Sequence, residues 1–170
     1  MRPYTILLLL ALIVSISCSK DKDAGPVSKL VGTWTGVSST TTITVGNLGY
    51  KEYLISQGVD ESAADLLVTL AENTATLSGF FSELEIKADN SWKGHTEILG
   101  QAIDATGKWT LSSDEKQLTL TSDLQPGVEK HATITTLNDT DLVLDIPGDE
   151  VDGAPEGYVS KVTAKLTRKK

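Results

Sequence analysis

The sequence predicts a mainly β protein with a single domain, an eight-stranded antiparallel up-and-down β-barrel that carries a short helical insertion between its first two strands. Short runs in which apolar and polar residues alternate recur from Leu30 to Leu166, and turn residues separate them. Between the first two runs, residues 50–73 have helical spacing and helix-capping residues instead. A chain of 170 residues is long enough for one domain with a sizeable core.

The first seventeen residues are typical of a secretion signal. Arg2 precedes an apolar run of nine residues at 6–14, and small residues follow before Cys18, the only cysteine. A spanning helix needs roughly twenty apolar residues, so we do not expect this run to remain as a transmembrane anchor. Because Cys18 has no disulfide partner, we favour its lipidation over an unmodified thiol.

The residues around Cys18 resemble a bacterial lipobox, although Ser15 stands where such motifs usually carry Leu. The resemblance implies that Cys18 is the lipidated first residue of the mature protein and attaches it to the bacterial outer membrane. We therefore expect a signal peptide at 1–17, a lipidated tether at 18–27 and the barrel domain at 28–170. The polar tether fits a plain linker or a signal for display at the cell surface, and both readings stay open.

The first strand is expected at residues 30–45, with a bend or bulge between Ser38 and Thr42. A helix from Tyr50 should then end at Gly58, a residue typical of helix C-termini. Asp60 can cap a second helix whose apolar residues share one face. These apolar residues are Ala63, Leu66, Leu67 and Leu70.

Seven further strands follow, each with an apolar stripe at every second residue that we expect to face the interior. The stripes are Leu84 and Ile86; Trp92, Gly94, Thr96 and Ile98; Ala105, Gly107, Trp109 and Leu111; Leu118 and Leu120; Ala132 and Ile134; Leu142, Leu144 and Ile146; and Val162, Ala164 and Leu166. The spacing also fits an open β-sandwich. We favour a closed barrel, because a last strand that returns beside the first removes the exposed edges.

The motif Gly32-Thr33-Trp34 followed by this series of strands resembles the lipocalin-like (calycin) barrels. The two helices after the first strand are similar to those of the intracellular fatty-acid-binding proteins. The chain differs from these proteins in its export signal and in the absence of an Arg-x-Tyr pair near the C-terminus. The resemblance implies a barrel that binds a small apolar molecule. It also implies that Trp34 closes the barrel floor beneath a basic residue of the last strand, Lys165 or Arg168.

Several classes of function are not expected. The net charge of −8 makes nucleic acid an improbable partner. His95 and His131 fall on solvent faces, and no hydrolase, nucleotide-binding or metal motif is present, so we expect no enzyme, no metal and no cofactor. An acidic cluster could hold calcium, but a solvated loop is favoured. This cluster comprises Asp145, Asp149, Glu150, Asp152 and Glu156.

We expect a monomeric, lipid-anchored barrel that binds a small apolar molecule; the rival is a solid barrel that serves as an accessory subunit of a cell-envelope complex. A cavity above about 300 Å3 would favour the first. The helical insertion is expected to cover the open end as a lid. Because the inward stripes carry almost no basic residue apart from Arg168, neutral ligands are expected rather than free fatty acids. The predicted ligand contacts are Leu66, Leu67, Leu70, Phe80, Phe81, Trp92 and Trp109.

Overall fold

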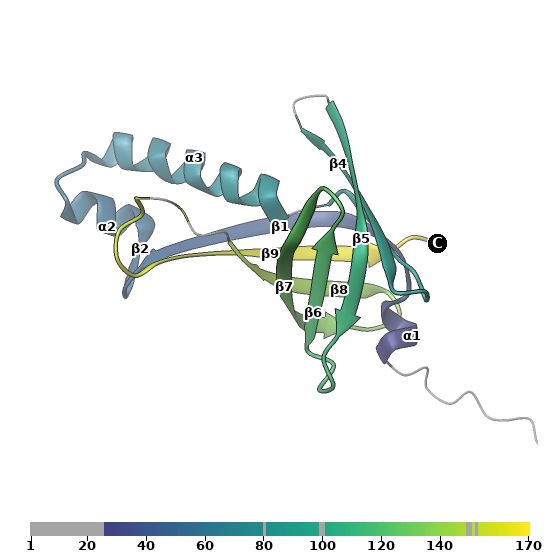
Figure 1. Cartoon of the computed structure of the whole chain (residues 1–170). Coiled ribbons are helices and arrows are strands. Elements are labelled where there is room, and N and C mark those ends of the chain that lie inside the picture. The colour runs from purple at the N-terminus through teal and green to yellow at the C-terminus, as the bar shows by residue number, and fades with distance from the viewer. Residues whose placement is uncertain (1–25, 80, 99–100, 149–150, 152) are drawn as a thin grey trace, which may run out of the picture.

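The computed structural model of the chain describes residues 26–79, 81–98, 101–148, 151 and 153–170 (Figure 1). Within these residues the helices are α1 (Pro26–Leu30), α2 (Tyr50–Ser56) and α3 (Glu61–Gly79). The strands are β1 (Gly32–Val45), β2 (Leu48–Gly49), β3 (Glu83–Ile86), β4 (Ser91–Ile98), β5 (Gln101–Leu111), β6 (Gln117–Ser122), β7 (Gln125–Leu137), β8 (Asp141–Pro147) and β9 (Tyr158–Arg168).

The strands close into a barrel. From β3 to β9 each strand pairs antiparallel with the next, and β3 also pairs with β1. β9 closes the barrel by pairing with β1, in a register that runs from Trp34 opposite Arg168 to Val45 opposite Tyr158. The two-residue β2 pairs only with the end of β1 and lies outside the barrel wall. The predicted eight-stranded closed barrel is confirmed. A barrel of eight strands has an interior that side chains fill or that holds one small ligand.

The predicted inward stripes form the core. The buried cluster takes residues from every strand of the wall and from the end of α1, and alternate residues on each strand contribute to it. Its buried members are Leu30, Trp34, Leu84, Ile86, Trp92, Trp109, Leu118, Ala132, Leu142, Leu144, Ala164 and Leu166. A bulge between Gly36 and Ser38 bends β1, just before the stretch in which the sequence predicts one.

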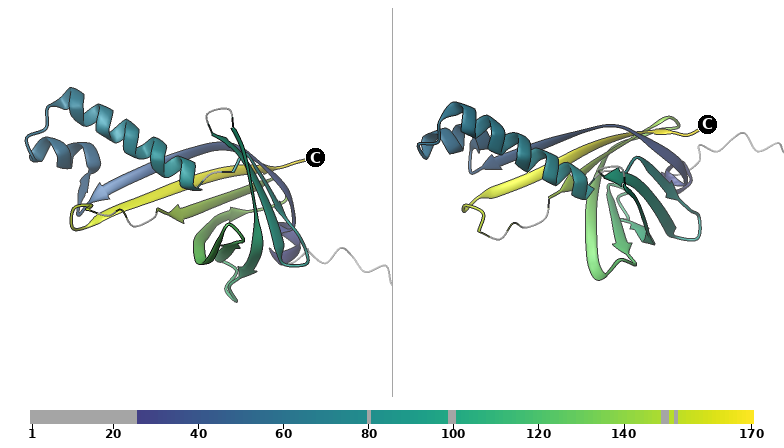
Figure 2. Two further views of the ribbon diagram at one scale, coloured as in Figure 1. Left: turned by 45° about the horizontal axis from the view of Figure 1, so that its top comes forward. Right: turned by 90° about the horizontal axis from the view of Figure 1, so that it is seen from above.

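β1 and β9 extend beyond the rest of the barrel as a two-stranded arm (Figures 1 and 2). The register explains the arm: β3 pairs with β1 only as far as Thr35, and β8 pairs with β9 only from Lys161 onward. α2 and α3 lie along one face of the arm, where Ile43 and Val45 are buried. Because an isolated two-stranded ribbon is marginally stable, this helical cover is what the arm needs to remain ordered.

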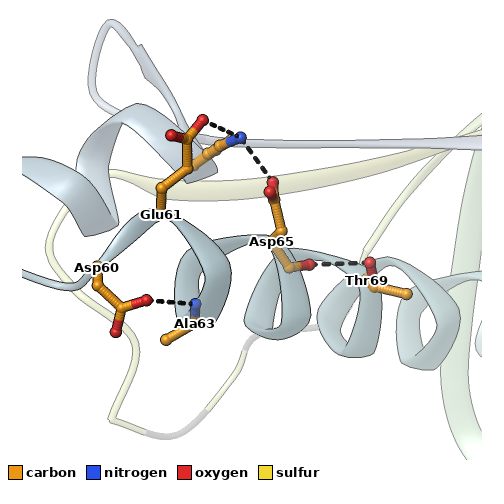
Figure 3. A network of polar contacts seen from close by, with 6 residues as sticks. Asp60, Glu61, Ala63, Asp65 and Thr69 are labelled. Carbon is orange, nitrogen blue, oxygen red and sulfur yellow. Dashed lines mark hydrogen bonds and ion pairs between the residues drawn. The ribbon is translucent and has the colours of Figure 1, made fainter.

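Local capping fixes the two helices. α2 ends at Ser56 with Gln57 as its C-cap, and Gly58 follows with φ +88°, the left-handed conformation that glycine adopts easily at the end of a helix. Oδ1 of Asp60 accepts a hydrogen bond from N–H of Ala63 at 3.0 Å, which confirms the predicted cap (Figure 3). Nζ of Lys51, on α2, lies 2.7 Å from Oδ1 of Asp65, on α3, and this ion pair joins the two helices.

The predicted buried face of α3 is wrong. Ala64 is fully buried, whereas Leu66 and Leu70 are 70% and 62% exposed. Ala64 and the half-buried Val68 belong to the face that packs on the arm. Residues two positions apart on a helix point in nearly opposite directions, so Leu66 and Leu70 lie on the other face. Small side chains let the helix approach the arm closely, so the leucines face outward.

Candidate ligand-binding cavity

One end of the barrel is closed around Trp34. Its side chain is fully buried, and Nε1 donates a hydrogen bond to the carbonyl of Leu30 at 2.9 Å. The guanidinium carbon of Arg168 lies 4.3 Å from the centroid of the Trp34 ring, a cation–π contact. The predicted basic cover is therefore confirmed, and it is Arg168 of β9; Lys165 is exposed.

Arg168 also joins two other chain segments at the closed end, residues 29–31 and the turn before β8. Nε donates to the carbonyl of Asp139 at 2.9 Å, Nη1 donates to the carbonyl of Val31 at 2.9 Å, and Nη2 donates to the carbonyl of Lys29. Gly32 makes room for the guanidinium: a Cβ built there would lie 2.2 Å from Nη1, and φ is +148°. The group that approaches Gly32 closely is therefore the Arg168 side chain.

The opposite part of the barrel interior contains a cavity of about 160 Å3. Most of its lining is apolar, and three alanines, one each on β5, β7 and β9, leave the space that larger side chains would fill. The described lining residues are Phe81, Leu84, Trp92, Ala105, Leu120, Ser122, Gln125, Val128, Lys130, Ala132, Leu144, Ile146, Ala164 and Leu166.

The cavity is smaller than the value of about 300 Å3 from which ligand pockets usually start. An apolar protein cavity of about 150 Å3 nonetheless holds a molecule of the size of benzene. The geometry therefore suits a compact ligand of about one ring, or a chain that extends through the open side of the cavity, and not a large polycyclic one.

Phe81 and Trp92 form the aromatic wall. Their ring centroids lie 5.4 Å apart, and Nε1 of Trp92 donates to the carbonyl of Thr121 at 2.9 Å. The ring of Phe81 lies against Gly94, where a built Cβ would lie 2.6 Å from the ring. The room left by the missing side chain of Gly94 is therefore occupied by this ring. Gly107 likewise lies against the backbone of Thr121 and leaves no void.

The polar side chains of the lining come from two adjacent strands, β6 and β7. They are Ser122, Gln125 and the half-buried Lys130, which is the one charged residue among the described lining residues. The expectation that the interior carries no basic residue other than Arg168 is wrong, because Arg168 caps the closed end and Lys130 lines the cavity. The sequence contains the signal: alternation from the inward Ala132 places Lys130 on the same face.

The other predicted contact residues lie elsewhere. Trp109 is buried in the core, where Nε1 donates to the carbonyl of Lys87 at 2.9 Å, and it does not line the cavity. Leu66, Leu67 and Leu70 do not line it either, because this part of α3 lies along the arm and not over the barrel mouth. Phe80 and Cys18 lie outside the described residues.

The titratable groups on the outer faces form local pairs. Nδ1 of His95 lies 2.8 Å from Oδ1 of Asp104, and this hydrogen bond lowers the pKa of the Asp104 carboxyl. Asp145, the first residue of the acidic cluster, accepts hydrogen bonds from Thr163 and Lys161, which lower the pKa of its carboxyl. Asp149, Glu150 and Asp152 fall outside the described residues.

Among the residues that the structure describes, no group of three or more His, Cys, Asp or Glu side chains is arranged to hold a metal ion. In the same part of the chain, every helix is too short or too polar to cross a membrane.

Comparison with known proteins adds the family. Among solved structures, the chain is similar to bovine odorant-binding protein with a selenium-containing odorant, at 13% identity and a TM-score of 0.48, over 89% of this chain and 77% of that chain. The same bovine protein in complex with undecanal gives 13% identity and a TM-score of 0.48, over 89% and 78%. A DUF4847-family protein from Bacteroides vulgatus is similar at 14% identity and a TM-score of 0.35, over 78% of this chain and 90% of that chain.

No curated protein matches the chain significantly. A family model described as a lipocalin-like domain, however, matches residues 30–144, which is well over half of the chain. That match spans the Trp34 motif, the helical insertion and most of the strands of the barrel wall. The chain belongs to the lipocalin-like domain family.

Proposed function

We propose that this protein binds one small, mainly apolar molecule in the cavity bounded by Phe81, Trp92 and Ala132. The observation that carries the proposal is the apolar cavity of about 160 Å3 beside a core that is otherwise filled. Burial of a ligand there removes its apolar surface from water at about 25 cal/mol per Å2. The barrel supplies the rigid wall, so little ordering of the protein opposes binding.

The test uses the purified protein and two neutral probes of one ring, toluene and benzyl alcohol. We expect saturable binding that shifts the NMR signal of the Trp92 indole N–H and leaves that of Trp34 unchanged, because only Trp92 lines the cavity. Ala105→Leu, which fills the cavity from β5, should abolish binding. Ala102→Leu is the matched control, since Ala102 lies exposed on the same strand. Unchanged binding by Ala105→Leu would place the probe elsewhere and contradict the proposal.

The rival function, a solid barrel that acts as an accessory subunit of a cell-envelope complex, is favoured by two observations. The cavity is below the usual size of a ligand pocket, and α3 exposes Leu66 to solvent. On this reading neither probe binds the unaltered protein, so the same titrations decide between the two functions.

We further propose that the protein is a monomer anchored to the bacterial outer membrane by lipid on Cys18, on the periplasmic or the cell-surface side. The support is the sequence: a basic start, a nine-residue apolar run and a single cysteine. Two acyl chains on the mature N-terminus suffice for stable anchoring. Cys18→Ser should release the protein from the membrane fraction, and a variant that remains there after a salt wash would overturn the lipid anchor.

A further inference from the structure

An exposed apolar stripe runs along the outer face of α3. Leu66 is 70% exposed and Leu67 is 40% exposed, and Leu70, which also takes part in another interaction, is 62% exposed. Residues three or four positions apart are neighbours on a helix surface, so these side chains form one continuous stripe. The opposite face, with Ala64, packs on the arm (Figure 2). Adjacent exposed leucines of this kind are typical of a surface that contacts a partner.

Acidic side chains flank the stripe on one side. Glu61, Asp65 and Glu72 are spaced by four and seven residues, which places them in one row beside Leu66. The sequence of α3 contains no lysine, arginine or histidine. Nζ of Lys51, on α2, lies 3.1 Å from Oε1 of Glu61 and 2.7 Å from Oδ1 of Asp65 (Figure 3). This one ammonium group offsets only part of the negative charge of the row.

The charge of the two helices decides what can cover the stripe. Residues 50–73 hold five acidic residues and one basic residue, a net charge of −4, which is half of the net charge of the chain. A second copy of the chain would bring the same negative charge to both sides of the contact, and like charges repel. Helices that lie in a membrane surface are rich in Lys and Arg, so a surface of anionic lipids is disfavoured too. A basic partner is attracted instead.

We propose that the outer face of α3 binds an amphipathic helix of another protein. The apolar side of that helix contacts Leu66 and Leu67, and its flanking Lys or Arg side chains face Asp65 and Glu72. An amphipathic helix presents apolar residues at every third or fourth position, the spacing of the stripe itself. Its basic side chains can donate charge-assisted hydrogen bonds to the carboxylates. None of these four residues lines the cavity, so the inference does not depend on the proposed function.

The test titrates the purified protein with two synthetic amphipathic helical peptides. Both carry the same pattern of leucines, and their polar positions are lysine in one and glutamate in the other. We expect the lysine peptide to bind at least about tenfold more tightly at low salt, a difference of about 1.4 kcal/mol. The preference should fall as salt is added, because the charges on both sides are exposed and are screened.

Two pairs of variants locate the contact. Leu66→Gln should weaken binding of the lysine peptide about tenfold, whereas Leu124→Gln, the matched control, should change it less than about twofold. Leu124 is 65% exposed on the turn between β6 and β7. Glu72→Gln should weaken binding about threefold, and Glu97→Gln, which removes an exposed acid from β4, should change it less than about twofold.

Every other outcome overturns the inference. Equal binding of the two peptides, or of neither, would show that charge does not select the partner. Equal effects of Leu66→Gln and Leu124→Gln, or of Glu72→Gln and Glu97→Gln, would indicate contact at no particular surface. If the protein alone forms dimers or binds anionic vesicles, and Leu66→Gln abolishes this, the stripe is covered by a second copy or by lipid. The toluene and benzyl alcohol titrations are separate, so failure of either proposal leaves the other standing.

Discussion

The two ends of the barrel are built on opposite principles. At the closed end Trp34 is fully buried, its indole N–H has an acceptor, and Arg168 donates to three backbone carbonyls in two separate segments. Around the cavity, three alanines leave space, and the polar side chains lie on one hairpin. The difference indicates that stability is concentrated at the closed end and binding capacity at the other, because a filled and fully bonded site has no room for a ligand.

The largest effect should come from removing the aromatic ring at the closed end. Trp34→Ala is expected to lower the free energy of unfolding by about 3–5 kcal/mol, as truncation of a core aromatic does. Phe81→Ala, at the cavity, should cost about 1–2 kcal/mol because its ring is only half-buried. Chemical denaturation measures both. A loss below about 1 kcal/mol for Trp34→Ala, or equal losses at the two ends, would contradict the division of roles.

Removing the guanidinium should cost less than removing the ring. Arg168→Met keeps an apolar stem over Trp34 but leaves the carbonyls of Val31, Lys29 and Asp139 without this donor, and we expect a loss of about 2 kcal/mol. Lys165→Met on the same strand serves as the control and should change stability by less than about 0.5 kcal/mol. Because the effect belongs to the closed end, the binding of benzyl alcohol to folded Arg168→Met should be unchanged.

A smaller effect is expected where the strand meets the aromatic wall of the cavity. Gly94→Ala places a methyl group against the ring of Phe81 and should cost about 1 kcal/mol, the low end for overpacking, because the half-buried ring can shift. In a Phe81→Ala background the same substitution should cost almost nothing. A double-mutant cycle measures this coupling. Additive losses would show that the ring does not determine the need for glycine.

The smallest effect should be a pH dependence on the outer face of β8. Hydrogen bonds from Thr163 and then Lys161 lower the pKa of the Asp145 carboxyl below 3.8, its ordinary value. The folded state therefore gains stability at pH values above 3.8, and this gain disappears as the pH falls through the lowered pKa. Asp145→Asn should lose less than about 1 kcal/mol at neutral pH and show a shallower loss in acid. Denaturation at pH 7 and pH 3 measures this, and identical acid slopes would contradict it.

The strands could be predicted because alternation is a local property of the sequence. Trp92, Leu118 and Leu144 occupy inward positions whatever lies opposite them. Each predicted stripe therefore still faces the interior when the barrel is closed. The count of eight runs and the return of the last beside the first then gave the architecture. The cover of Trp34 by a basic residue of the last strand followed from the resemblance to a family, which left Lys165 and Arg168 open, and the structure identifies Arg168.

The face of α3 and the composition of the cavity depend on distances between elements, and these are not local. Hydrophobicity favoured the Leu66 face, but the way α3 packs on the arm buries Ala64 and leaves Leu66 exposed. The contact of Phe81 with Gly94 could not be predicted, because the path of the chain after α3, which brings Phe81 onto β4, is not encoded in the strand pattern. Lys130 was overlooked because apolar residues were sought, although alternation already placed it inward.

The pairing of β1 with β9 has a consequence for folding kinetics. The bond from Arg168 to Val31 joins residues 137 positions apart, and the β1–β9 ladder is the longest in the barrel. Proteins dominated by such distant pairings fold slowly, in milliseconds to seconds. Until β9 docks, the Thr-rich middle of β1 presents an open edge to other unfolded chains, and such edges promote aggregation. Substitutions that slow docking of β9 should therefore lower the yield of refolding before they lower the stability of the folded protein.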